Sequence, residues 1–114
     1  MTTLFPDVVH VMGSGVHPTS PEPGLERRVG AYNTKLFLAE HRMEKGWAGV
    51  AHSHPHDQMA YVVSGHLRIQ AGDQTFEIRS GDSFVVRGGV QHQAWALESS
   101  VVVDVFTPCR EDYL

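Results

Sequence analysis

The sequence predicts an all-β fold, a sandwich or barrel with little helix. Short runs rich in β-branched and aromatic residues recur between turns that contain Gly or Pro, which is typical of all-β domains. No segment of ten or more residues shows a helical repeat. The chain has 114 residues, 41% of them apolar, which suits a single domain with one hydrophobic core.

Residues 1–24 are expected to form an N-terminal arm. Positions 13–24 hold three of the six prolines and three of the eleven glycines, a composition that favours turns and extended backbone over any regular element. Two interpretations remain open for this segment. It is either a mobile leader or a strand laid across a partner subunit.

Six strands are expected after the arm, and their alternation indicates which side of each strand is buried. Leu67 and Ile69 alternate with polar residues, as do Phe76 and Ile78 after a turn at 71–73. This pattern predicts a hairpin with one apolar, buried face and one polar, solvent-exposed face. The expected strands span residues 34–41, 59–63, 67–70, 75–78, 84–86 and 101–106.

Three histidines and a glutamine form the clearest candidate site. His52 and His54 are separated by one residue, and on an extended segment this spacing points both imidazoles to one face. With Gln58 and His92 they predict one bound divalent transition metal, for which nickel, manganese, iron and zinc all remain possible. Four protein ligands leave one or two coordination positions open, as a catalytic site requires. The small residues that share a face with Gln58 or His92 are Ala60, Ala94 and Ala96.

The segments that carry these donors resemble the two sequence motifs of the cupin superfamily. The first motif, G-x5-H-x-H-x3-E-x6-G, matches residues 46–65, and the second, G-x5-P-x-G-x2-H-x3-N, matches residues 81–96. Every motif glycine and histidine is present, but Gln58 replaces Glu, Arg87 replaces Pro and Ala96 replaces Asn. The resemblance implies a single-domain cupin, a jelly-roll-like β-barrel over residues 25–114.

The replacement of Glu by Gln58 bears on the chemistry of the site. A neutral amide oxygen leaves the charge of a divalent ion uncompensated by the protein, so the ion is a stronger Lewis acid. A carboxylate would donate more electron density and would stabilise higher oxidation states. The glutamine therefore favours polarisation of a substrate oxygen over oxygen activation.

The last expected strand places an acidic residue in an otherwise apolar run. Alternation puts Asp104 on the same face as Val102 and Phe106. A buried carboxylate is costly unless it is paired. Asp104 is either a structural residue, paired with Arg110 or a backbone donor, or a proton-transfer group that faces the metal.

A narrower resemblance favours the second interpretation of Asp104. Residues 52–58 and 104–114 look like segments of the small pectin-degradation cupins of the KdgF type, which linearise 4,5-unsaturated uronate monosaccharides from pectin or alginate breakdown. The resemblance implies an isomerase- or lyase-type enzyme in which Asp104 moves a proton, Arg110 pairs with the substrate carboxylate and Phe106 packs on the sugar. The alternatives are another metal-dependent cupin enzyme, a dioxygenase or lyase, and a non-catalytic metal- or sugar-binding cupin.

The remaining histidines and the cysteine receive no catalytic role. His56 is ambiguous, but Pro55 interrupts the alternation, which favours a place at a loop edge. Cys109 has no evident histidine partner and is expected to be an inert thiol. The unassigned histidines are His10, His17, His41 and His66.

Charge and composition bound the partners of the chain. A net charge of −4 with scattered Lys and Arg argues against nucleic acid and an anionic membrane surface. A single cysteine and an N-terminus without a signal-peptide pattern favour a cytoplasmic location. A homodimer is expected because strand 34–41 is apolar on both faces, although a covering N-terminal arm is the alternative.

Overall fold

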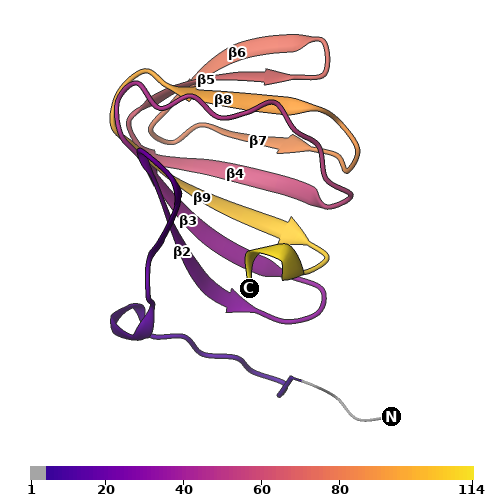
Figure 1. Ribbon diagram of the computed structural model, residues 1–114. Coiled ribbons are helices and arrows are strands. Elements are labelled where there is room, and N and C mark those ends of the chain that lie inside the picture. The colour runs from indigo at the N-terminus through magenta and orange to yellow at the C-terminus, as the bar shows by residue number, and fades with distance from the viewer. Residues whose placement is uncertain (1–4) are drawn as a thin grey trace.

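The computed structural model describes residues 5–114, which form two antiparallel β-sheets facing each other across a shared core (Figure 1). The six-stranded sheet has the order β1-β2-β3-β9-β4-β7, and the three-stranded sheet has the order β6-β5-β8. The strands are β1 Thr19–Glu22, β2 Leu25–Tyr32, β3 Phe37–Met43, β4 Asp57–Ser64, β5 His66–Ala71, β6 Gln74–Arg79, β7 Ser83–Val86, β8 His92–Ala96 and β9 Ser100–Thr107. The only helical elements among the described residues are two 3₁₀ turns, η1 Gly13–Gly15 and η2 Glu111–Tyr113.

This architecture confirms the predicted all-β fold with little helix, and the core follows the predicted alternation. Leu67 and Ile69 of β5 are 1% and 4% exposed, and Val62 of β4 is fully buried. Burying each such aliphatic side chain contributes about 1.5–3 kcal/mol. Side chains from both sheets therefore hold the two layers together. The buried cluster comprises Leu25, Met43, Ala60, Val62, Leu67, Ile69, Ile78, Ala96 and Val102.

All six expected strands are present, most with one or two more residues at their ends. The exception is the first, which begins at Phe37 because the side chain of Asn33 accepts hydrogen bonds from the backbone of Lys35 and Leu36. These bonds, both 2.9 Å, hold the residues before Phe37 in a turn.

The N-terminal part of the chain is more regular than its composition predicted. We expected no regular element in residues 13–24. This expectation is wrong, because β1 lies within the segment and pairs with β2 of the same chain. Strand β2 was also missed. Its inward-facing positions include Arg27 beside Leu25, so the apolar alternation that marks the other strands is interrupted.

The connection between β3 and β4 runs along β8 like a further strand (Figure 1). Gly46 donates to the carbonyl of Ala96, and Gly49 donates to that of Ala94, both at 2.9 Å. His52 and His92 then exchange two backbone hydrogen bonds, of 3.0 and 2.9 Å. The connection is thereby anchored along its length and delivers His52 opposite His92.

Within the two cupin motifs, backbone geometry requires glycine at two positions, Gly65 and Gly88. Gly65 has φ +102°, and a Cβ there would overlap Ser100. Gly88 packs so closely against the loop before β4 that a Cβ would overlap the carbonyl oxygen of Pro55. Gly88 also donates its N–H to Asp57 at 2.8 Å, which joins the loop before β8 to the start of β4.

The outer face of the six-stranded sheet includes exposed apolar residues, beside the ion-paired side chains of β2 and β3. One row across four strands consists of Leu38, Val105, Met59 and Val85, which are register neighbours. Met59 is 53% exposed and Val85 is 61% exposed. Within residues 5–114, no helix is long and apolar enough to cross a membrane.

Replacement of Leu67 by Ala should lower the free energy of unfolding by about 2–5 kcal/mol, because it leaves a cavity between the sheets. Urea denaturation followed by tryptophan fluorescence measures this loss. The matched control is Leu36→Ala, at a side chain 55% exposed, which should change stability by less than about 0.5 kcal/mol. Equal losses in the two variants would contradict the assigned core.

Candidate metal centre

Three of the four predicted ligands converge at one point. The ring nitrogens available as ligands in His52, His54 and His92 all lie within 4.8 Å of one another. The backbone pairing of His52 with His92 brings the two rings to a centroid distance of 4.5 Å. His54, two residues along the same segment, has its ring centroid 4.9 Å from that of His92. The H-x-H spacing therefore produces the cluster predicted from the sequence.

Each of the three imidazoles is oriented by the main chain. In every case Nδ1 donates to a backbone carbonyl two residues away, which assigns the ring proton to Nδ1 and leaves the Nε2 lone pair free. In His92 this Nε2 atom is buried and has no hydrogen-bond partner. The accepting carbonyls belong to Val50 for His52, His56 for His54 and Val90 for His92, at 2.9, 3.0 and 2.9 Å.

Gln58, at the start of β4, supplies an oxygen at the same point. Its amide Nε2 donates to Oδ1 of Asp104 at 2.9 Å, which turns its Oε1 towards Nε2 of His54 at 3.1 Å. Because His54 carries its proton on Nδ1, two lone pairs then face each other. A cation between them would convert this repulsion into coordination, so the residues present fit a divalent metal ion.

Burial favours the neutral form of two of the three histidines. It lowers the pKa of His54 and of His92 below the ordinary value of 6.5. The nearby positive charge of Arg110 lowers the pKa of His54 further. In these two residues the neutral imidazole, which is the form that coordinates a metal, therefore predominates at neutral pH.

Asp104 lies beside the cluster and is 5% exposed. Its Oδ1 accepts from Gln58, and its Oδ2 is 2.7 Å from Nδ1 of His41. Among the described residues its partners are these two side chains. The structural interpretation in which Asp104 pairs with Arg110 is wrong, because the ion-pair partner of Arg110 is Asp112.

Arg110 is held in place but keeps one donor group free. Its Nε and Nη2 donate to the two carboxylate oxygens of Asp112 at 2.9 and 2.6 Å, and the guanidinium lowers the pKa of Asp112 to about 2. The guanidinium also lies 3.9 Å from the ring centroid of Tyr113. Its Nη1 is buried without a hydrogen-bond partner, which is the state expected of a site for an anionic ligand.

Phe106 packs behind the ligands. It is 1% exposed, and its ring meets that of His54 edge-on at 5.7 Å. The guanidinium of Arg110 lies 4.8 Å from the same ring. Phe106 thus contacts a metal ligand and an arginine of the site at once.

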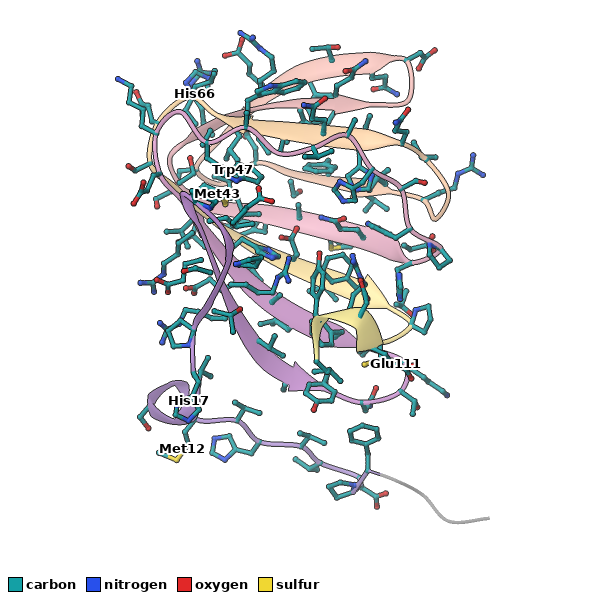
Figure 2. All side chains as sticks on the ribbon, viewed as in Figure 1. Met12, His17, Met43, Trp47, His66 and Glu111 are labelled. Carbon is teal, nitrogen blue, oxygen red and sulfur yellow. The ribbon has the colours of Figure 1, made fainter. Side chains whose placement is uncertain are left out.

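One cavity of about 370 Å³ lies between the two sheets and is lined by His52, Gln58, His92, Asp104, Phe106 and Arg110, whereas His54 is outside its lining. Its apolar part is formed by aliphatic and aromatic side chains from both sheets, and further polar residues complete the lining. Figure 2 shows Met43 and Trp47, from this apolar part, together at one end of the strands, and Glu111, next to Arg110 in the chain, towards the other. This volume suits a small ligand.

The structure adds three site residues that sequence reasoning left out. His41 was unassigned, yet it is 8% exposed and contacts Asp104. Arg27 and Tyr113 also line the cavity. The sequence signal for these residues was Arg27, a basic residue at an inward position of β2. It indicates a site residue only once the pairing of Arg27 with His41 of β3 is known.

The remaining histidines and the cysteine considered in the sequence analysis lie outside the histidine cluster. His56 donates from Nε2 to the carbonyl of Cys109 at 3.1 Å, at a loop edge. Burial raises the pKa of the Cys109 thiol, with a further contribution from Glu111, which agrees with an inert cysteine. His66 pairs with Glu77 at the surface.

Comparison with known proteins agrees with this geometry. The family model for the cupin domain matches residues 39–106, the segment that contains all four predicted ligands. The chain belongs to the cupin family. This cupin is 30% identical over 93 residues to the pectin degradation protein KdgF of Dickeya dadantii, covering 80% of the chain and 84% of that protein.

Solved structures show the same fold. A KdgF structure from Halomonas sp. matches with a TM-score of 0.88 and 31% identity, covering 94% of this chain and 99% of that one. An RmlC-like cupin from Shewanella frigidimarina also matches with a TM-score of 0.88, at 30% identity, covering 92% and 95% of the two chains. These relatives confirm the jelly-roll cupin architecture.

Replacement of His92 by Ala should abolish stoichiometric metal binding, because it removes the buried Nε2 donor at the centre of the cluster. Elemental analysis after reconstitution with nickel, manganese, iron(II) or zinc measures the bound ion. His17→Ala, at an exposed position of the arm, is the matched control and should retain the metal. Unchanged metal content in His92→Ala would refute the assigned ligand set.

Proposed function

We propose that this cupin is a metal-dependent enzyme that converts 4,5-unsaturated uronate monosaccharides, from pectin or alginate breakdown, to the linear 5-keto form. The observation that carries the proposal is one cavity lined by His52, Gln58 and His92, by a buried carboxylate and by a buried arginine with a free N–H group, with His54 clustered against the two other histidines. The likeness to two proteins named KdgF, one of them a pectin degradation protein, supports the same choice of substrate.

Arg110 would bind the carboxylate of the sugar acid. Its pairing with Asp112 anchors two nitrogens of the guanidinium, whereas the buried Nη1 remains available for the ligand. A charge-assisted hydrogen bond in a buried site is strong and directional. The sugar ring would therefore be oriented by its acid group.

Asp104 would move the proton. Ring opening transfers the proton from the hydroxyl on C1, forms the C1 carbonyl and breaks the bond from C1 to the ring oxygen. The resulting enolate takes up a proton at C4 and becomes the 5-keto acid, so one proton leaves O1 and one arrives at C4. Each oxygen of Asp104 accepts one hydrogen bond from the protein and retains a lone pair for this proton.

His52, His54, Gln58 and His92 would hold the divalent ion, whether nickel, manganese, iron or zinc. When bound, the ion would supply Lewis-acid stabilisation of negative charge on the ring oxygen. The four protein donors are neutral and take none of its charge. Phe106, proposed to pack on the sugar, also supports His54 and Arg110 from behind.

Replacement of Asp104 by Asn should reduce the rate by about 10²-fold or more, because the amide keeps the shape of the side chain but cannot accept the proton. The assay follows loss of the conjugated-alkene ultraviolet absorbance of unsaturated galacturonate and of the alginate-derived monomer. Asp73→Asn, in the exposed turn before β6, is the control and should retain full activity. A fully active Asp104→Asn variant would exclude the proton-transfer role.

The wild-type protein also tests the substrate class. Binding of the uronates without loss of their absorbance would indicate a non-catalytic cupin. Oxygen uptake by the iron form, with uronates untouched, would indicate a dioxygenase. Either result would overturn the proposed reaction.

We also propose that the protein is a homodimer in which a second copy covers the outer face of the six-stranded sheet. Leu38 and Met59 on this face are 39% and 53% exposed, whereas Phe37 and Ala39 on the inner face are buried. Covering the row through Leu38, Val105, Met59 and Val85 would remove apolar surface from water.

Light scattering of the wild-type protein should give twice the mass of one chain, and Met59→Asp should shift it to the monomer by placing a charge in the apolar face. Thr75→Asp, at an exposed position of β6, is the control and should remain dimeric. A monomeric wild-type protein would contradict this assembly.

A further inference from the structure

We infer that Arg27 and His41 are positioning residues, which hold the Asp104 carboxylate in one orientation through a hydrogen-bond chain across three neighbouring strands. The catalytic consequence rests on the proposed function, since Asp104 is the group that moves the proton there. The chain itself is a property of the fold. It extends the site beyond the residues that touch metal or substrate.

The chain is continuous and short. Nε of Arg27 donates to Nε2 of His41 at 3.0 Å, and Nδ1 of His41 lies 2.7 Å from Oδ2 of Asp104. The three residues come from β2, β3 and β9, which are adjacent in the six-stranded sheet. Arg27 and His41 are direct register partners, and Asp104 pairs with Ala39 on the same strand as His41. The backbone ladder therefore sets the spacing of all three side chains.

The donor at one end dictates the direction of every bond. A guanidinium has only donors, so Nε2 of His41 must accept. The proton of His41 is then on Nδ1, from which it is donated to Oδ2 of Asp104. Without Arg27, the imidazole could adopt the other tautomer and would present a lone pair to the carboxylate. Arg27 thus reinforces, from the opposite side of the ring, the tautomer that donates to the acceptor-only carboxylate of Asp104.

The orientation of Asp104 also reaches the metal ligands. Its Oδ1 accepts from the amide of Gln58, and this bond turns Oε1 of Gln58 towards His54. A rotated Asp104 would release that amide and allow its oxygen to turn away. Groups that orient a ligand in this way typically change metal affinity or activity by about 10–100-fold.

The placement of Arg27 fits an orienting role. Among residues 5–114 no carboxylate lies within ion-pair distance of it. Its guanidinium lies 3.5 Å from the ring centroid of Tyr113, which also contacts Arg110. The guanidinium of Arg27 is thus held by an aromatic ring. Its Nε donates to the imidazole of His41 and not to a carboxylate.

The first experiment measures the tautomer directly. Nitrogen-15 NMR of the histidine side chains in wild-type protein should show His41 with its proton on Nδ1, and Arg27→Met should convert a measurable fraction to the other tautomer. Arg28→Met, on the opposite face of the same strand, is the matched control and should leave the His41 signals unchanged. An unaltered His41 tautomer in Arg27→Met would overturn the inference.

The second experiment separates positioning from simple support of the fold. His41→Asn retains an N–H donor near the position of Nδ1, whereas His41→Leu has a similar volume and no donor. Relative to wild type, His41→Leu should lower kcat by on the order of 10-fold or more, with KM changed far less. His41→Asn should recover most of the loss. Equal activity of the two variants would contradict a role through the hydrogen bond.

The two experiments distinguish the failure of this inference from the failure of the proposed function. If the wild-type protein leaves unsaturated uronates unchanged, the proposed reaction is wrong, and the NMR comparison still decides whether Arg27 orders His41. A second outcome is that the uronates react while the Arg27→Met variant keeps both the His41 tautomer and the kcat of the wild-type protein. In that case the proposed reaction stands and the positioning role of Arg27 is refuted. Poor folding of His41→Leu does not affect the Arg27→Met comparison.

Discussion

The candidate metal centre depends on the backbone pairing of the connection at 46–52 with β8. This pairing places His52 against His92 with two hydrogen bonds, and His54 follows at a spacing set by the chain. Each ligand imidazole is then fastened to a carbonyl two residues away. The main chain thus orients the donors, and the close approach of Gly88 to Pro55 fixes the loop that carries His54.

The electrostatics of the centre follow from one unusual ligand. With Gln58 in place of the usual glutamate, all four predicted donors are neutral. The nearby negative charge is instead on Asp104, which accepts a hydrogen bond from Gln58. The carboxylate is buried and oriented by Gln58 and His41. An acid group therefore lies beside the histidine cluster without belonging to it, which is the arrangement that the proposed proton transfer requires.

The sequence predicted the parts of the site that depend on local spacing. The structure brings His52, His54 and His92 together and buries Asp104, as alternation along their segments predicted, whereas their roles as ligands and acid group stay predictions. Arg27 and His41 could not be found in this way, because their roles arise from pairing between β2, β3 and β9. The same cause hid β2, since an inward arginine that serves the site breaks the apolar pattern by which strands are recognised. Strand β1 was hidden by Pro21, which an edge strand tolerates.

The bond between Gln58 and Asp104 has a thermodynamic consequence. It joins a metal ligand to the proposed acid–base group, so the binding of an ion and the occupation of Asp104 by a ligand share one free energy of coupling. Such coupling is reciprocal. A compound that draws the carboxylate towards itself would change the affinity of the site for the ion, and the choice of ion would in turn alter how tightly that compound is held.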